Sequence, residues 1–492
     1  MPVQIRTHKT KNNSHPPEFM LEKVPTGIRG LDEVTRGGFP KGRAALICGG
    51  PGAGKTLLGL EFLVRGALHF QEPGVCIAFE ETTEEIVTNM ASLGYDVAAL
   101  MREKKLGIDH VHIEPRQIEE TGEYDLEPLF IRLRHAIDRV KAKRVFLDTI
   151  ELLFLGLKDE RLVRSELRRL FHWLKDAGVT AVITAETGAN TLTRYGIEEY
   201  VADCVIILDH RVTEQVSTRR LRVMKYRGSA HGTNEYPFLL DDDGISVVPI
   251  TSLGLTHSAL TERISCGVAG FDNMLTGKGF FRGSSVLITG SAGTGKSSFA
   301  AAFADAACTR GERALYFAFE ESPSQILRNM SSIGINLNPW LKRGLLKIHA
   351  ARPTTMGLEG HLAIMHKEIE AFAPDVVVTD PITNLVSVGD LTSVKAMLTR
   401  MIDLLKSKGI TAMFTNLVIE GDVDETAIGI SSLMDTWLVL RTVEQGAERM
   451  RTLSLLKSRG MAHDTGTHSF SLSDKGILIH GNQQTISATQ AQ

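Results

Sequence analysis

The stretches "GGPGAGKTL" (residues 49–57) and "GSAGTGKSS" (residues 290–298) both match the phosphate-loop pattern G-x-x-x-x-G-K-[ST]. Each follows an apolar run typical of a buried strand, "RAALICGG" or "SSVLITG", and precedes apolar residues at helical spacing. Glycines let main-chain N–H groups wrap phosphates at a helix N-terminus, where the helix dipole also favours anions. The chain is therefore predicted to bind a nucleotide twice.

Within these loops, Lys55 and Lys296 are predicted to reach the β- and γ-phosphates of ATP. The hydroxyls of Thr56 and Ser297 are predicted to ligate Mg²⁺, so ATP and Mg²⁺ are the expected cofactors. The predicted ATP-binding loop residues are Gly49, Gly50, Pro51, Gly52, Ala53, Gly54, Lys55, Thr56 and Leu57 in the first loop, and Gly290, Ser291, Ala292, Gly293, Thr294, Gly295, Lys296, Ser297 and Ser298 in the second.

The two loops belong to a long internal repeat. "VPTGIRGLDEVTRGGFPKG" returns as "ISCGVAGFDNMLTGKGFFRG", and "IAFEETTEEIVTNMASLGYD" returns as "FAFEESPSQILRNMSSIGIN". A unit of this length is a duplicated domain and not a solenoid repeat. The predicted divisions are a flexible head (1–22), a first domain (23–250), a linker (251–262), a second domain (263–480) and a flexible tail (481–492).

Strand and helix patterns alternate in both copies, and the strands are continuously apolar. This pattern predicts an α/β fold in which each copy is a mostly parallel sheet flanked by helices on both faces. The net charge of −3 argues against a nucleic-acid partner. The apolar runs are too short to span a membrane, and the five scattered cysteines favour a cytoplasmic setting.

Paired glutamates follow an apolar run in each copy: Glu80 with Glu81, and Glu320 with Glu321. Acids at the carboxyl end of a strand beside the phosphate loop can deprotonate a water or hydroxyl that attacks the γ-phosphate. The plainer alternative is that they cap the helix that follows or interact favourably with its dipole. We expect a catalytic role for at least one member of each pair.

Asp148 in "RVFLDTI" and Asp380 in "VVVTDPI" end apolar runs. A strand-end aspartate is often only a turn signal, but beside a phosphate loop it suits the acid that helps to hold Mg²⁺ through water. Both are therefore included among the ATP-binding residues.

A fourth landmark, K-x-R-G-x-x-H, occurs as "KYRGSAH" and "KSRGMAH". A single copy could be a basic surface turn, but its duplication suggests a shared duty. We expect these side chains to contact the nucleotide of a neighbouring subunit, as arginine fingers do. They are Lys225, Arg227 and His231, and Lys457, Arg459 and His463.

Carried twice and in this order, the four landmarks resemble the KaiC family of tandem RecA-like ATPases, which is known from circadian clocks and from non-clock bacterial relatives. The resemblance runs from about Lys23 to Ile479. It implies a homohexamer of two stacked rings with ATP between subunits. It also implies that the N-terminal ring is a slow ATPase and that the C-terminal ring is a serine/threonine autokinase.

The resemblance places the phosphorylation site on Ser431 and Ser432, in "TAIGISSLMDTWLVL", and relates Thr426 to the same cycle. Two serines in a loop are by themselves only turn chemistry. The internal repeat adds that Glu199 of the first copy matches Ser431 of the second. Phosphorylation would therefore give the second copy a negative charge that the first always carries.

The resemblance also implies a possible KaiB-like partner on the N-terminal ring. Little sequence follows "SLSDKGILI", which argues against a KaiA-type activator, and Ile333 stands where clock members tend to place a tryptophan. Two other functions remain open. A RecA-type nucleic-acid motor would need a basic, aromatic-bearing loop, and the segments after Asp148 and Asp380 are acidic to neutral. A nucleotide-gated scaffold would not need four glutamates.

Overall fold

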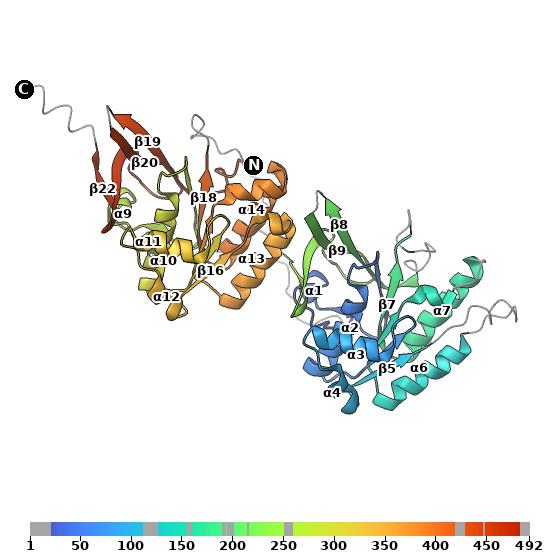
Figure 1. The fold of residues 1–492 in the computed structure, drawn as a ribbon. Helices are drawn as coiled ribbons and strands as arrows, with labels where there is room; N and C mark the ends of the chain where they lie inside the picture. Colours follow the sequence, from blue (N-terminus) through green and yellow to red (C-terminus); the bar gives the residue numbers. More distant parts are fainter. Residues whose placement is uncertain are drawn as a thin grey trace, which may run out of the picture. The chain divides into compact units, whose positions relative to one another are not determined.

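The computed structural model describes residues 21–111, 126–154, 160–188, 193, 201–213, 216–249, 259–418, 429–445 and 448–482. By the density of its contacts the chain divides into two compact units (Figure 1). One comprises residues 1–207 and 223–233, and the other comprises residues 208–222 and 234–492.

The first nucleotide-binding loop lies in a nine-stranded sheet, counted over the described residues, with the order β11-β10-β9-β8-β3-β7-β6-β4-β5. The neighbours from β3 to β5 are parallel, whereas β9, β10 and β11 pair antiparallel. The strands are β3 (Ala44–Gly49), β4 (Gly74–Ala78), β5 (Leu106–His110), β6 (Arg144–Asp148), β7 (Thr180–Glu186), β8 (Cys204–Thr213), β9 (Val216–Tyr226), β10 (Glu235–Asp241) and β11 (Gly244–Val247).

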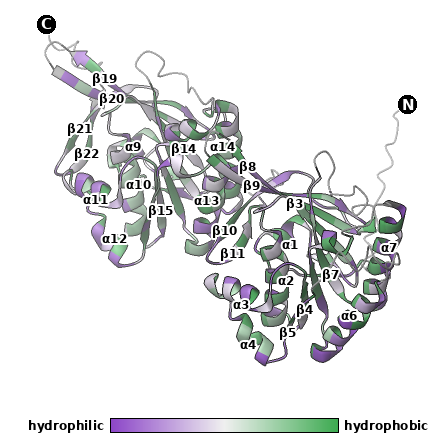
Figure 2. Ribbon diagram, turned by 45° about the vertical axis from the view of Figure 1, so that its right-hand side comes forward, coloured by the Kyte–Doolittle hydropathy of each residue, from purple (hydrophilic) through white to green (hydrophobic). Residues whose placement is uncertain are grey.

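Helices cover the parallel part of this sheet, and an apolar core joins its strands to α6 and α7. Figure 2 shows hydrophobic residues along β4 and β7, and hydrophilic residues on parts of α6 and α7. The helices are α1 (Leu31–Val34), α2 (Lys55–His69), α3 (Thr83–Ser92), α4 (Val97–Arg102), α6 (Glu127–Val140), the 3-10 helix η1 (Ile150–Phe154) and α7 (Glu160–Asp176); a short ribbon pairs β1 (Lys23–Val24) with β2 (Phe39–Pro40).

The second sheet has nine strands among the described residues, with the order β16-β15-β17-β18-β14-β19-β20-β21-β22. Its neighbours from β16 to β19 are parallel, and β19 to β22 form antiparallel pairs. The strands are β14 (Ser285–Gly290), β15 (Ala314–Ala318), β16 (Leu346–Ala350), β17 (Val376–Asp380), β18 (Thr411–Leu417), β19 (Thr436–Gln445), β20 (Glu448–Ser458), β21 (Thr467–Ser473) and β22 (Gly476–Asn482).

Two separate apolar cores lie on the two faces of this sheet because its strands point alternate side chains to opposite sides. Ile288 packs in the core with α10, and the neighbouring Leu287 packs in the core with α13 and α14. Figure 1 shows the ribbons of these three helices. The helices are α9 (Ala269–Met274), α10 (Lys296–Thr309), α11 (Pro323–Ser331), α12 (Asn338–Lys342), η3 (Pro353–Thr355), α13 (Leu358–Phe372), η4 (Ile382–Val388) and α14 (Leu391–Ser407), and a second short ribbon pairs β12 (Arg263–Ile264) with β13 (Phe280–Phe281).

These observations confirm the predicted fold: two tandem α/β domains, each with a large, mostly parallel sheet flanked by helices. No helix in the described ranges combines the length and the hydropathy that crossing a bilayer requires.

Candidate functional site

The first phosphate loop connects the end of β3 at Gly49 to the start of α2 at Lys55. Gly52 and Gly54 have φ angles of 70° and 97°, in the left-handed region that side chains other than glycine rarely adopt. The Lys55 ammonium donates to the carbonyl oxygens of Gly49 at 2.7 Å and Gly50 at 3.1 Å. The loop therefore curls around this cation at the N-terminus of a fifteen-residue helix.

The second loop repeats this geometry between Gly290 and Lys296. The Lys296 ammonium donates to the carbonyl oxygens of Gly290 at 2.9 Å and Ser291 at 2.8 Å. Burial lowers the pKa of Lys296, and the nearby charges of Asp380 and Glu320 oppose this shift. The lysine and the two acids are therefore close enough to interact.

A cavity of about 340 Å³ lies over the second loop. Its lining includes Gly293, Lys296 and Ser297 from the loop, both glutamates of the second pair, and Asp380. The fold thus brings three of the four landmarks of the second copy to one concave site of a size that suits a small-molecule ligand.

The strand-end aspartates lie beside the hydroxyls predicted to hold Mg²⁺. In the first domain, Thr56 donates from its hydroxyl to Asp148 Oδ2 at 2.6 Å, and Thr184 donates to Oδ1. Burial raises the pKa of Asp148, whereas these two hydrogen bonds and the charge of Lys55 lower it. A hydroxyl and a carboxylate at the N-terminus of the loop helix form a hard oxygen donor set, which fits Mg²⁺.

Asp380 has a different set of donors. Thr415 donates to its Oδ1, as Thr184 does to Asp148, but its Oδ2 accepts a hydrogen bond from the Tyr316 hydroxyl at 2.6 Å. Burial, followed by the negative charge of Asp380, raises the pKa of Tyr316 well above its ordinary value. Sequence reasoning missed Tyr316 because a tyrosine within an apolar strand looks like an ordinary core residue.

The glutamate pairs do not cap the following helices. Thr82 caps α3 and Ser322 caps α11, and each forms a reciprocal capping box with the residue three positions later, Glu85 or Gln325. The strands end at Ala78 and Ala318, so the two glutamates of each pair lie two and three residues beyond a strand, and the prediction that they end their strands was wrong. The side-chain caps of both helices are therefore residues other than the four glutamates.

The two members of each pair differ. The second member accepts a hydrogen bond from an asparagine eight residues later: Asn329 donates to Glu321 Oε1 at 3.0 Å, and Asn89 bonds Glu81. Burial raises the pKa of Glu81, with the charge of Asp148 adding to the shift. The first members, Glu80 and Glu320, are exposed. The asparagines were also missed, although their matching places in the repeat offered a signal.

The K-x-R-G turns lie at the opposite end of each sheet from the phosphate loop. In the first domain, the Arg227 N–H donates to the carbonyl oxygen of Asp203, whose own N–H donates to Ala44, the first residue of β3. Gly49 is the last residue of that strand. At about 3.3 Å per residue, roughly 17 Å of strand separates the two ends. Neither turn is therefore brought to the phosphate loop of its own domain.

The second domain repeats this placement. The Arg459 N–H donates to the carbonyl oxygen of Asp435, whose own N–H donates to Ser285, the first residue of β14, whereas Gly290 is the last residue of that strand. The histidines of both motifs contact residues close to them in the chain: His463 Nδ1 lies 3.2 Å from the Met461 carbonyl oxygen, and the His231 ring stacks on Tyr226.

Ser431 and Ser432 form a turn just before β19, at the same end of the sheet as Lys457. Lys457 donates to the carbonyl oxygen of Ser431 at 2.9 Å, and Arg459 donates to that of Ser432 at 2.6 Å. The Ser432 residue is exposed and Ser431 is half-buried. Thr426 and Glu199, which the sequence linked to these serines, lie outside the described residues.

Comparison with known proteins agrees with this double site. The family model described as "ATPase: KaiC" matches residues 24–252 and again residues 264–484. The circadian clock protein KaiC2 of Synechocystis sp. is 54% identical over 477 residues, which cover 96% of this chain and 84% of that protein. The circadian clock oscillator protein KaiC of Synechococcus elongatus is 37% identical over 471 residues, which cover 95% of this chain and 91% of that protein. This chain therefore belongs to the KaiC family of tandem ATPases.

Proposed function

We propose that this KaiC-family ATPase hydrolyses ATP in its first domain and uses ATP in its second domain to phosphorylate Ser431 and Ser432 of an adjacent subunit. The observation that carries the proposal is the placement of the two serines at the far end of β14 from the phosphate loop of their own domain. A phosphoryl group held at Gly290 to Ser297 is out of their reach within one domain. A neighbouring subunit in a ring supplies the missing acceptor.

The residues of the second site divide the work of transfer. The loop N–H groups and Lys296 hold the phosphates, and Asp380 with Ser297 provides the oxygen ligands for Mg²⁺. When bound, Mg²⁺ offsets the charge of the β- and γ-phosphate oxygens. Glu320 is exposed at the cavity, so we assign it as the base that takes the proton of the serine hydroxyl.

The bonds that form and break follow from this assignment. The serine Oγ bonds to the γ-phosphorus as the bond from that phosphorus to the β–γ bridging oxygen breaks, and ADP leaves. In the first domain, Glu80 has the same exposed position after β4, and water replaces serine as the nucleophile. Hydrogen bonds from asparagines hold Glu81 and Glu321, and we assign these two glutamates to positioning the groups around the neighbouring base.

The same placement supports a homohexamer in which Lys225 and Arg227, or Lys457 and Arg459, complete the nucleotide site of the next subunit. A phosphate on Ser431 or Ser432 would add about −1.5 to −2 charge beside Lys457 and Arg459. Lys457 and Arg459 would then bind either the carbonyl oxygens or the phosphate, and this exchange would change the contacts at the subunit boundary. We infer a timing or signalling switch of this kind, with a KaiB-like protein as the candidate partner of the N-terminal ring.

Intact-mass measurement after incubation with Mg-ATP tests this function. The wild-type chain is expected to gain mass in steps of one phosphate, and peptide mapping is expected to place it on Ser431 or Ser432. The matched control, Ser431→Ala with Ser432→Ala, is expected to hydrolyse ATP without gaining phosphate. Hydrolysis with no phosphate on the wild-type chain would support an ATPase without kinase activity. Neither hydrolysis nor phosphate would support a nucleotide-gated scaffold.

A further inference from the structure

Asp148 and Asp380 each accept one hydrogen bond from an equivalent threonine, and they differ in their second donor. Thr184 and Thr415 occupy equivalent strands and donate to Oδ1 of Asp148 and Asp380. The Oδ2 atom of Asp148 accepts from Thr56, the loop residue predicted to ligate Mg²⁺. The Oδ2 atom of Asp380 accepts instead from Tyr316, at the same distance of 2.6 Å.

The different donors to the two Oδ2 atoms follow from one difference between the two copies of the repeat. Tyr316 lies in β15 opposite Val378 of β17, and Cys76 holds the matching place in β4 opposite Phe146 of β6. The Tyr316 side chain is 1% exposed, so its hydroxyl depends on a protein partner. A cysteine thiol is only a weak donor, which leaves Asp148 Oδ2 to the loop threonine.

The consequence concerns the hydroxyl that ligates the metal. Because the Thr56 hydroxyl donates a hydrogen bond to Asp148, its lone pairs stay free to ligate a cation that these two residues would hold. Within the described residues, no hydrogen bond joins Ser297 to Asp380, whose Oδ2 already accepts from Tyr316. Asp148 therefore orients the Thr56 hydroxyl before Mg²⁺ binds, whereas Asp380 does not orient the Ser297 hydroxyl in this way.

We propose that Tyr316 is a positioning residue of the second site, whose hydroxyl occupies Asp380 Oδ2 in competition with Ser297 and so makes that site bind Mg²⁺ more weakly than the first. This inference rests on the proposed function, because it needs Ser297 and Asp380 to hold the metal. Its effect is to make the kinase domain more sensitive than the ATPase domain to the supply of Mg²⁺.

The test uses the full chain and a fluorescent, non-hydrolysable ATP analogue titrated with Mg²⁺. Lys55→Ala disables the first loop, so that the signal reports the second site. Adding Tyr316→Phe keeps the ring but removes the donor, and it is expected to lower the Mg²⁺ concentration at half-saturation by roughly 3- to 10-fold, in keeping with the loss of one competing hydrogen bond of ordinary net strength. The control is Tyr236→Phe, which removes the hydroxyl of a tyrosine that is also 1% exposed and lies in β10. It is expected to change nothing.

A double-mutant cycle separates positioning from mere packing. Ser297→Ala is expected to cost more Mg²⁺ affinity in the Tyr316→Phe background than in its absence, because Ser297 then has no competing donor at Asp380 Oδ2. Additive effects of the two substitutions would overturn the inference. An unchanged or raised half-saturation concentration in Tyr316→Phe would do the same.

A comparison of the two sites needs no change at Tyr316. Chains with Lys55→Ala report the second site and chains with Lys296→Ala report the first, and the second is expected to need several-fold more Mg²⁺. Equal or reversed requirements would overturn the inference even if Tyr316→Phe failed to fold. Analogue binding that is independent of Mg²⁺ in both chains would instead overturn the proposed function itself, and the inference with it.

Discussion

Lys457 and Ser431 are joined by a hydrogen bond of 2.9 Å from the lysine ammonium to the serine carbonyl oxygen. Arg459, two residues further along, makes the same kind of bond to Ser432. The motif expected to reach nucleotide on another subunit therefore also supports the turn that is expected to receive phosphate. A change in the contacts of Lys457 or Arg459 is therefore expected to alter the Ser431–Ser432 turn, and a change in the turn is expected to alter the contacts of these two side chains.

The exposed glutamate of the second pair is predicted to be the kinase base. Glu320→Gln keeps the shape of the side chain but cannot take a proton, so the rate of phosphorylation is expected to fall by roughly 10²- to 10⁴-fold. Glu321→Gln keeps an oxygen for Asn329 and is expected to cost much less. Radiolabel transfer from ATP measures both variants, and a larger loss in Glu321→Gln would reverse the assignment.

Hydrolysis is predicted to depend on the first pair instead. Glu80→Gln together with Glu81→Gln is expected to remove most phosphate release while phosphorylation persists, because the two sites lie in different domains. The matching pair of substitutions at Glu320 and Glu321 is expected to have the reverse effect. Free phosphate and protein-bound phosphate, measured in the same samples, distinguish them. Equal loss of both activities in both variants would refute a division of labour.

Asp435 is predicted to be a main support of the second domain. It accepts from the N–H and the hydroxyl of Ser285, each at 2.9 Å, and pairs with Lys406 at 2.8 Å. Asp435→Asn is expected to lower the free energy of unfolding by about 1.5–3 kcal/mol, the usual worth of hydrogen bonds to a charged group.

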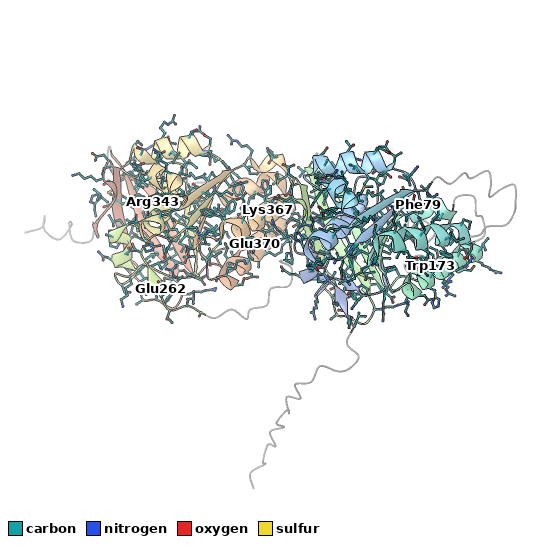
Figure 3. The ribbon with its side chains drawn as sticks, turned by 90° about the horizontal axis from the view of Figure 1, so that it is seen from below. Phe79, Trp173, Glu262, Arg343, Lys367 and Glu370 are labelled. Atoms are coloured by element: carbon teal, nitrogen blue, oxygen red, sulfur yellow. The ribbon has the colours of Figure 1, made fainter. Side chains whose placement is uncertain are left out.

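Tryptophan fluorescence can follow that domain alone. Of the three tryptophans, Trp173 lies on α7 of the first domain (Figure 3), and Trp340 and Trp437 lie in the second. In a Trp173→Phe background, urea unfolding therefore reports the second domain. Asp203→Asn, at the matching place in the first domain, is the control and is expected to leave this transition unchanged. An equal effect of both substitutions would show that the support is not local.

The second domain is also predicted to lose stability as the pH falls below neutrality. Burial lowers the pKa of His361, whose Nε2 lies 2.8 Å from the Pro353 carbonyl oxygen. The unfolded chain therefore takes up the proton first, and the free energy of unfolding decreases as the pH falls from the ordinary histidine value toward the lower folded value. In the same fluorescence assay, His361→Gln is expected to weaken this pH dependence. An unaltered dependence would exclude His361 as its source.

Much of the fold could be predicted from the sequence because its signals are local. Continuous apolar runs such as "RAALICGG" and the glycine pattern that follows them fix strand, loop and helix in order, and the structure has β3, the loop and α2 there. The internal repeat then doubles every such signal. The loop lysines and the aspartates could be placed for the same reason.

The partners of these residues could not be predicted, because they depend on pairing between distant strands. Tyr316 meets Asp380 across sixty-four residues only because β15 and β17 are neighbours, and Thr415 meets it from β18. The opposite placement of Lys457 and its own loop likewise follows from the direction of β20 relative to β14, which no local pattern records.

Assembly is predicted to depend on nucleotide, since Arg227 and Arg459 lie away from the phosphate loops of their own domains and are proposed to complete sites on other subunits. Light scattering with and without Mg-ATP is expected to show a larger particle with it. The variant Arg459→Ala is expected to weaken that assembly and lower phosphorylation. A monomer of unchanged size that still hydrolyses ATP at the full rate would contradict any role between subunits.

Mixed subunits test the central claim, that phosphate passes between chains, most directly. One chain carries Lys296→Ala and keeps its serines, and the other keeps its loop but carries Ser431→Ala and Ser432→Ala. After mixing with Mg-ATP and separation by mass, phosphate is expected on the chain with the damaged loop, while each chain alone gains none. Failure of that chain to gain phosphate in the mixture, while wild-type chains held as monomers become phosphorylated, would contradict the account.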